Sequence, residues 1–260
     1  MLASVAGGLP GCARAPVPPE LSVLSRDDAP ASEALSPESV YLTQREGGTL
    51  YIDERGDRFR RRVERTGDAW DVRLEREHDE GSPEPVRTVE LVRTPKGEIA
   101  MRALIDHAGV GPGRSRRGSR VVFEPPLVLL PASLGSEDAF ESQAGARLFM
   151  RGGSEDDSSG EAGEARRSAR LGASERLKLR TAEAAHKDHS RGHIEARVVE
   201  AELDLRFGRT RIRRTERLWV HPDLGIVAEA AGVRVSFAGI QVDRREHLHV
   251  MASEATPTPP

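Results

Sequence analysis

The clearest strand in the chain is residues 197–207, which read RVVEAELDLRF. Apolar and charged side chains alternate along it. One face holds Val199, Ala201, Leu203, Leu205 and Phe207, and the other holds Glu200, Glu202, Asp204 and Arg206. A period of two residues predicts a strand with one buried face and one face in water. The segment therefore predicts an antiparallel sheet that is packed on one side.

Similar runs recur through much of the chain. Trp70, Val72 and Leu74 alternate with charged residues, and residues 86–93 and 98–105 flank a Pro-Lys-Gly turn. Short strands separated by glycine turns indicate antiparallel all-β architecture, and the same reasoning predicts a strand at 40–43. We therefore predict an all-β (mainly β) fold. It is a curved antiparallel sheet, either a half-barrel or an open sandwich, with a disordered N-terminal tether and a disordered internal insertion.

The most apolar stretch is residues 121–131, and it contains three prolines. Proline lacks the N–H that a central strand donates to its neighbour, so this stretch is predicted to cross over the sheet rather than to join it. Its Leu127–Leu130 run is predicted to be buried in the core. If that run were exposed instead, it would form a ridge for a partner or a lipid.

The overall composition excludes some functions. Hydrophobic residues make up 37% of the chain and charged residues 31%, while aromatic residues make up only 4%, which disfavours a large aromatic-lined pocket. Three of the 39 basic residues are lysines, so 36 are arginines, but the formal net charge of −3 gives no overall basic field for nucleic acid. A single cysteine permits no internal disulfide, so the core alone must hold the chain together.

That cysteine, Cys12, directly follows Leu9-Pro10-Gly11. The four residues Leu9-Pro10-Gly11-Cys12 resemble the end of a bacterial lipoprotein signal peptide, although Pro10 is unusual there. The resemblance implies cleavage before Cys12 and attachment of lipid to its sulfur, with enough acyl chains for stable anchoring. Residues 1–8 contain no Lys or Arg, whereas such a signal begins with a basic region, so we expect a truncated signal. The implied location is the bacterial cell envelope, membrane-anchored and facing the periplasm.

Shifts in composition divide the chain into six segments. Pro, Ala and Ser dominate after Cys12, and Gly, Ser, Glu, Asp and Arg dominate after Arg151, with too little apolar content in either place to form a core. We predict a signal peptide at 1–11, a lipid-anchored disordered tether at 12–38, the first half of a β domain at 39–151, a disordered insertion at 152–175, the second half of the β domain at 176–251 and a disordered tail at 252–260.

Two stretches resemble a loose group of uncharacterised bacterial envelope proteins. Residues 218–227 read LWVHPDLGIV, an aromatic residue, a short turn and a Gly-apolar-Val run, and Leu127–Leu134 resembles the proline-rich crossover of the group. These proteins are similar to periplasmic lipoprotein carriers, whose fold is a curved antiparallel sheet. The resemblance implies the fold but carries over no ligand-binding residue.

Two groups of histidines are candidates for metal ligation. His186, His189 and His193 recur at a spacing that would place three imidazoles on one helical face, but a serine and a glycine interrupt any helix there. His247 and His249 share one face of a predicted strand, where two imidazoles can chelate a metal. We interpret both groups as solvated surface. A metal-dependent enzyme or metal-binding protein that uses either group is the alternative.

The sequence contains no G-x-S-x-G, P-loop or H-E-x-x-H motif. No carboxylate stands in an apolar run that would shift its pKa usefully, and Glu124, between Phe123 and Pro125, comes closest. We therefore predict a non-catalytic cell-envelope lipoprotein that binds an apolar ligand or acts as a scaffold or interaction protein. It is expected to have no cofactor and no nucleic-acid partner. Its expected partners are the membrane, through Cys12, and an apolar ligand or an envelope protein.

Overall fold

The computed structural model describes residues 23–27, 35–43, 47–107, 118–132, 139–150, 160–178 and 193–252. About three quarters of these residues are in β-strands, and the one helix among them is a short helix of five residues. In chain order the elements are β1 (Val23–Asp27), α1 (Pro37–Tyr41), β2 (Thr49–Asp53), β3 (Arg58–Thr66), β4 (Ala69–Arg76), β5 (Glu84–Arg93), β6 (Ile99–Asp106), β7 (Ser119–Leu130), β8 (Ala139–Met150), β9 (Glu161–Lys178), β10 (His193–Phe207), β11 (Thr210–His221), β12 (Gly225–Phe237) and β13 (Ile240–Met251).

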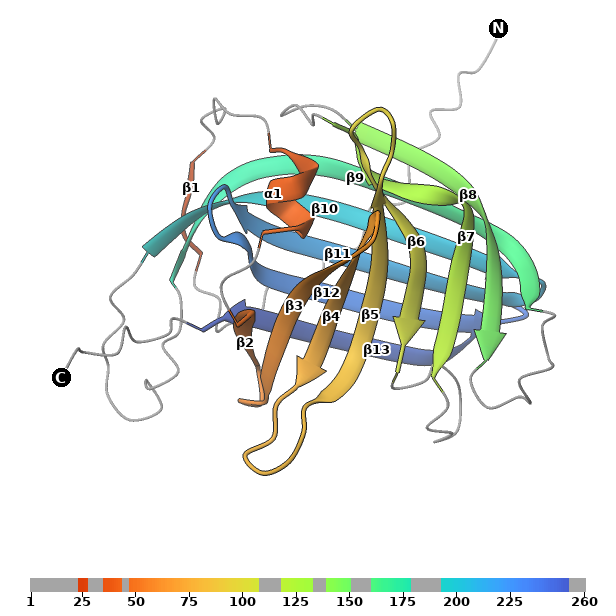
Figure 1. Ribbon diagram of the computed structural model, residues 1–260, viewed down its shortest axis with the longest axis horizontal. Helices are drawn as coiled ribbons and strands as arrows, with labels where there is room; N and C mark the ends of the chain where they lie inside the picture. The colour runs from red at the N-terminus through yellow and green to blue at the C-terminus, as the bar shows by residue number, and fades with distance from the viewer. Residues whose placement is uncertain are drawn as a thin grey trace, which may run out of the picture.

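The strands form a closed antiparallel barrel of 12 strands plus one extra strand (Figure 1). From β2 to β13 each strand pairs with the next in the chain, and β13 returns to pair with β2 through His249–Met251. The extra strand, β1, pairs with residues 174–177 of β9, beyond the part of β9 that pairs with β8. The all-β class and the curved antiparallel sheet are confirmed. The sheet goes further than the predicted half-barrel, because closure pairs the two edges that an open sheet would leave free.

The alternation predicted for residues 197–207 is confirmed in β10. Its apolar face is at most 7% exposed, and it packs in one core with residues of the opposite wall such as Leu91, Met101 and Leu127. The charged residues between them are partly or fully exposed, with Arg206 the most open. The period-two pattern therefore distinguishes the inside of the barrel from the outside.

The prediction that prolines keep residues 121–131 out of the sheet is wrong. This stretch lies in β7, which pairs with both β6 and β8. The prolines fit because the ladder skips them: Val122 pairs with Ala103 of β6, the next β6 pairing is Leu127 with Met101, and the pairing with β8 ends at Glu124. No ladder hydrogen bond is needed from Pro125 or Pro126 in such a bulge. The predicted burial of the leucines is confirmed, since Leu127, Leu129 and Leu130 are at most 4% exposed.

The segment boundaries also need correction. The predicted disordered insertion at 152–175 is wrong over residues 161–175, which belong to the long strand β9. Small and charged residues suffice there because alternate positions such as Ala165, Ala169 and Leu171 are buried while their neighbours face water. The predicted tether at 12–38 contains strand β1 and the start of α1. The predicted signal peptide at 1–11, Cys12, residues 152–159 and the tail from 253 lie outside the described residues.

Residues 37–41 form helix α1, whereas the sequence predicted a strand at 40–43. Ser36 caps the helix by accepting a hydrogen bond from the backbone N–H of Ser39 at 3.1 Å, and Pro37 occupies the first turn. The helix packs on β11 and β12 and inserts Val40 and Tyr41 into the core (Figure 1). It therefore covers part of the barrel interior near the turn that joins those two strands.

A buried ion pair joins β9 to β11. Glu175 accepts hydrogen bonds from Arg217 at 2.6 Å and from the indole of Trp219 at 2.8 Å, and the Arg217 guanidinium lies 5.0 Å from the Trp219 ring centroid. All three residues are at most 4% exposed. Because burial of a charge carries a large desolvation cost, this pair is stable only while both partners are present.

Among the described residues, no helix has the length and hydrophobicity that crossing a membrane requires.

We expect Glu175→Ala to destabilise the protein by about 3–5 kcal/mol, because it leaves the Arg217 guanidinium buried without its carboxylate. Urea unfolding followed by intrinsic tryptophan fluorescence measures the change. The matched control is Glu246→Ala, which breaks the exposed pair with Arg244 on β13 and should cost no more than about 1 kcal/mol. Equal effects of the two substitutions on stability would contradict the assignment of Glu175 and Arg217 as a buried ion pair on which the fold depends.

Candidate functional site

The barrel encloses a cavity that residues from most of its strands line. The space open to the centres of water molecules is about 90 Å³. One water needs roughly 10–15 Å³ in this measure, so the cavity has room for about six to nine waters or for an organic molecule of similar volume. A second pocket of about 60 Å³ adjoins it and shares Leu104, Leu203 and Arg214 with it. Most of the wall is apolar: Val72, Leu74, Val89, Leu91, Met101, Leu104, Leu129, Leu203, Leu218 and Ile226.

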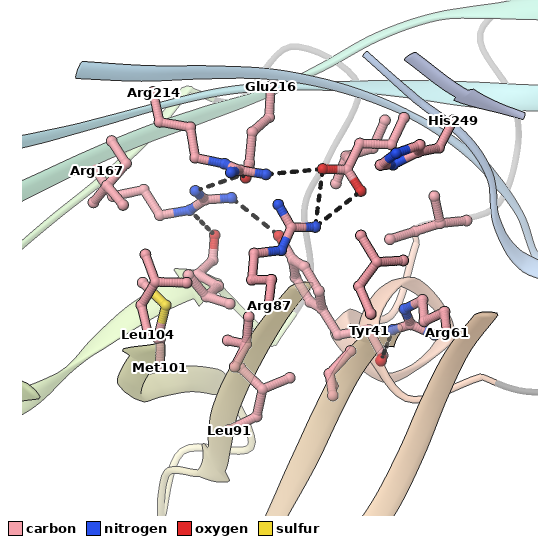
Figure 2. A pocket seen from close by; sticks show the side chains of 18 of the residues that line it. Tyr41, Arg61, Arg87, Leu91, Met101, Leu104, Arg167, Arg214, Glu216 and His249 are labelled. Atoms are coloured by element: carbon pink, nitrogen blue, oxygen red, sulfur yellow. Dashed lines mark hydrogen bonds and ion pairs between the residues drawn. The ribbon is translucent and has the colours of Figure 1, made fainter. Parts of the chain in front are cut away.

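A connected group of charged side chains crosses this apolar space (Figure 2). We call it the interior charge cluster, and it consists of Arg87 of β5, Arg167 of β9, Arg214 and Glu216 of β11, and Glu229 of β12. Every member is largely buried, with side-chain exposure between 3% and 19%. Burial of a charge costs free energy unless the charge is paired, so the geometry of these contacts decides whether the interior is stable.

Glu229 lies at the centre of the cluster. Arg87 donates to both of its carboxylate oxygens at 3.1 and 3.2 Å, and Arg214 donates to one of them at 2.9 Å. His247 of β13 lies 3.5 Å from the same carboxylate. Burial alone would raise the pKa of Glu229, but Arg87, the His247 contact and Arg214 together hold it well below 4.5. Glu229 is therefore ionised at neutral pH.

Glu216 continues the cluster toward α1. It accepts from Arg214 at 2.5 Å and lies 3.4 Å from Arg167. Burial would raise the pKa of Glu216, but Arg214 and Arg167 lower it below 4.5. Arg167 also donates to the Tyr41 hydroxyl at 3.0 Å and to the backbone carbonyl of Leu129 at 3.2 Å, so all three of its donor nitrogens are used. This contact ties helix α1 to the charged interior.

Arg61 of β3 is a fourth arginine in the cavity wall, with a different role. Its guanidinium donates to the backbone carbonyls of Tyr41 and Thr43, the latter at 3.0 Å. These carbonyls lie at the C-terminal end of α1, where a helix leaves acceptors without intrahelical partners. Burial lowers the pKa of Arg61, but an arginine remains cationic in proteins. Arg61 therefore caps and positions the helix.

His249 also lines the cavity, from β13. It is 5% exposed, and its Nδ1 is buried without a hydrogen-bond partner among the described residues. Burial lowers the pKa of His249 to about 3, although the nearby Glu229 opposes the shift. The imidazole is therefore neutral at physiological pH. The interpretation of His247 and His249 as a solvated outer face is wrong, because closure of the barrel turns that face inward.

The structure provides no metal centre on the histidines that it describes. His247 and His249 come together with ring centroids 4.9 Å apart. However, no group of three or more His, Cys, Asp or Glu side chains in the described part of the chain could hold a metal ion. His186 and His189 lie outside the described residues, and only the backbone of His193 is described, at the start of β10. Glu124 lies on β7 and is exposed rather than set in the apolar core.

Sequence reasoning missed the interior charge cluster, although a signal for it was present. Arg214 and Glu216 share a strand face with Ile212 and Leu218, and Arg87 shares one with Leu91. Charged residues on the apolar face of an alternating strand indicate paired charges in a barrel interior. A search for carboxylates in continuous apolar runs cannot find them. Glu229 is harder to place, because a β-bulge between β11 and β12 changes which residues of β12 face inward.

Comparisons with protein-family models, curated proteins and solved structures found no match to the chain. The predicted resemblance to lipoprotein carriers therefore rests only on the residues quoted for it.

We expect the stability of the protein to fall as the pH is lowered from about 6.5. Because the pKa of His249 is lowered to about 3, the unfolded chain binds a proton there that the folded chain does not, and stability is lost between these values. Glu216 and Glu229, whose pKa values are also lowered, add to the loss below about 4.5. One such proton contributes a slope of about 1.4 kcal/mol per pH unit.

Urea unfolding at pH 7, 6 and 5 measures this slope. His249→Leu should flatten it in this range, because the substitution removes the group that takes up the proton. His78→Leu is the control, since His78 is exposed at the turn between β4 and β5. An unchanged slope in His249→Leu would show that another group dominates the acid dependence.

Proposed function

We propose that this chain is a non-catalytic binding protein of the bacterial cell envelope, and that its barrel interior holds an apolar ligand. The observation that carries the proposal is the partly open cavity in the barrel interior, whose wall is largely Leu, Val, Met and Ile. Ligand pockets are concave, mostly apolar and equipped with a few placed polar groups, and this cavity has that composition.

The width of the barrel supports a cavity rather than a filled core. A barrel of about eight strands has an interior that side chains just fill, and the diameter grows with the number of strands. With 12 strands the interior is wider than its apolar side chains fill completely, so a cavity remains beside the core that β10 forms with residues such as Leu91 and Met101. The helix α1 and the long arginine side chains occupy part of the centre, and the cavity is the space that remains.

The protonation states in the cavity favour binding over acid–base catalysis. A general acid or base works best when its pKa lies near the operating pH. The pKa values of Glu216 and Glu229 are shifted away from neutrality, as is that of His249. These groups keep a fixed charge or remain neutral, so they can orient a ligand but exchange no proton with it at pH 7.

The proposed location rests on the sequence Leu9-Pro10-Gly11-Cys12. Lipid on Cys12 would hold the barrel at a membrane, facing the periplasm, where it could receive a ligand of low water solubility. Expression in a bacterial host from the upstream reading frame tests this. A product that begins at Cys12 and carries acyl chains by intact-mass analysis is expected. A product that retains Met1 without added mass would contradict the anchor.

We expect the purified barrel to bind the neutral apolar dye N-phenyl-1-naphthylamine, with a rise in fluorescence as the dye enters an apolar space. Leu104→Trp adds a large side chain at the junction of the two pockets and should reduce binding at least tenfold. A fluorescence titration measures both affinities, and native mass spectrometry of the extracted protein reports any bound ligand.

Ile240→Ser is the matched control, because Ile240 is 71% exposed on the hairpin between β12 and β13 and could bind dye at the surface. It should leave the affinity unchanged. Loss of binding in Ile240→Ser but not in Leu104→Trp would place the dye outside the barrel. Absence of any dye binding or extracted ligand would remove the carrier function and leave the scaffold function.

A further inference from the structure

The cavity has more positive than negative charge in its wall. Four arginines line it, namely Arg61, Arg87, Arg167 and Arg214, against two glutamates. Asp106 lines the adjoining pocket and offsets one positive charge near Arg214. At least one guanidinium charge in the interior is therefore not balanced by a carboxylate of the described residues that line these pockets. An uncompensated buried charge is costly, and a ligand that supplies the missing negative charge would relieve that cost.

The hydrogen-bond donors of the cluster show where such a charge would bind. Both hydrogen bonds of Arg87 come from Nη2, so its Nη1 and Nε donate to no described residue. Arg214 uses Nε and Nη2, so its Nη1 likewise has no described acceptor. In contrast, every nitrogen of the Arg167 guanidinium is engaged, and Arg61 holds the end of α1.

His249 provides a second, independent observation at the same place. It pairs with Glu229 across the β12–β13 ladder, so it lies beside the carboxylate that Arg87 and Arg214 share. Its Nδ1 is buried without a partner in the described part of the protein, although His249 lines the cavity. A buried polar atom without a partner costs free energy, and a ligand oxygen would satisfy it. Three groups from β5, β11 and β13 thus lie around the Glu229 carboxylate in the cavity wall.

The apolar wall begins directly beside these donors. Figure 2 shows Arg87 reaching into the middle of the cavity, with Leu104 and Met101 to its lower left and Leu91 below it in the view. Leu104 and Leu203 continue the apolar surface into the second pocket. A molecule with a charged head at Arg87 would therefore have a continuous apolar surface along which its chain could lie.

We propose that the ligand is an amphiphile with a single carboxylate head, which binds between Arg87, Arg214 and His249 while its alkyl chain lies along Leu91, Met101 and Leu104. This inference rests on the proposed function and names the class of ligand. A guanidinium and a carboxylate form charge-assisted, often bidentate hydrogen bonds. A monoanion fits the site better than a dianion, because Glu216 and Glu229 remain ionised and would repel a second negative charge.

Isothermal titration calorimetry at pH 7.5 with probes of equal chain length tests the head group. The probes are dodecanoate, dodecyltrimethylammonium and dodecyl phosphate, each below its critical micelle concentration, and dodecanol below its solubility limit. We expect dodecanoate to bind at least tenfold more tightly than dodecanol, and the ammonium probe to bind most weakly. Dodecyl phosphate, largely a dianion at this pH, should bind more weakly than dodecanoate.

The outcomes separate this inference from the proposed function. Equal affinity for dodecanoate and dodecanol would overturn the carboxylate site while leaving an apolar ligand in the barrel. Tighter binding of dodecyl phosphate than of dodecanoate would overturn the proposal that the head group of the ligand is a monoanion. Failure of all four probes to bind would overturn the proposed function itself.

Arg87→Met, which keeps an unbranched apolar stem but removes the guanidinium and its charge, should lower the affinity for dodecanoate at least tenfold and leave that for dodecanol unchanged. Arg102→Met is the matched control, because Arg102 lies 44% exposed on β6 and contacts only Glu90 among the described residues. It should change neither affinity. If Arg87→Met does not fold, the ratio of the dodecanoate and dodecanol affinities in the unmodified protein still decides the head group.

Discussion

The contact between Arg87 and Glu229 is the interaction on which the interior of this barrel depends. Arg87 reaches from β5 and Glu229 from β12, so one ion pair, in which a single guanidinium nitrogen contacts both carboxylate oxygens, joins two distant strands. Arg214 and Glu216 extend the pair along β11, and Arg167 carries it to Tyr41 of helix α1. Removal of Glu229 would take away the carboxylate that Arg87 and Arg214 share, and removal of Arg167 would break the contact with Tyr41, so the position of the helix and the shape of the cavity depend on the same set of contacts.

The closure of the sheet explains why arginine suits this interior. The barrel closes only through the short pairing of β13 with β2, and this closure places 12 strands around one interior. Several buried side chains of β9 and β10 are as short as alanine, such as Ala165, Ala169 and Ala201, and extend only a short way from the wall. A guanidinium on a long apolar stem reaches the centre of the barrel while its stem packs against the wall. The same arrangement places hydrogen-bond donors within an apolar cavity, which is what recognition of an amphiphile requires.

Local alternation in the sequence was enough to predict the all-β class and the buried face of β10, because apolar residues occupy the buried face of a strand and polar residues occupy its exposed face. Closure could not be predicted, since it depends on the pairing of strands about 200 residues apart, such as Tyr51 with Met251. The proline bulge of β7 was missed because a gap in strand pairing leaves little trace in the local sequence. Most of β9 was missed because its small residues give only a weak alternating pattern. The inward position of His249 follows from closure and was missed with it. Arg214 and Glu216 could have been found from their place among Ile212 and Leu218.

Carbon-13 NMR of dodecanoate labelled at its carboxyl carbon and titrated in the presence of the protein tests most directly whether a positively charged ligand site lies inside the barrel. We expect a bound resonance distinct from the free one. Its carboxyl should titrate at a lower pH than free dodecanoate, because nearby guanidinium groups stabilise the ionised form. A bound carboxyl that titrates at the free value, or above it, would show that the head group remains in water or lies in an uncharged part of the cavity.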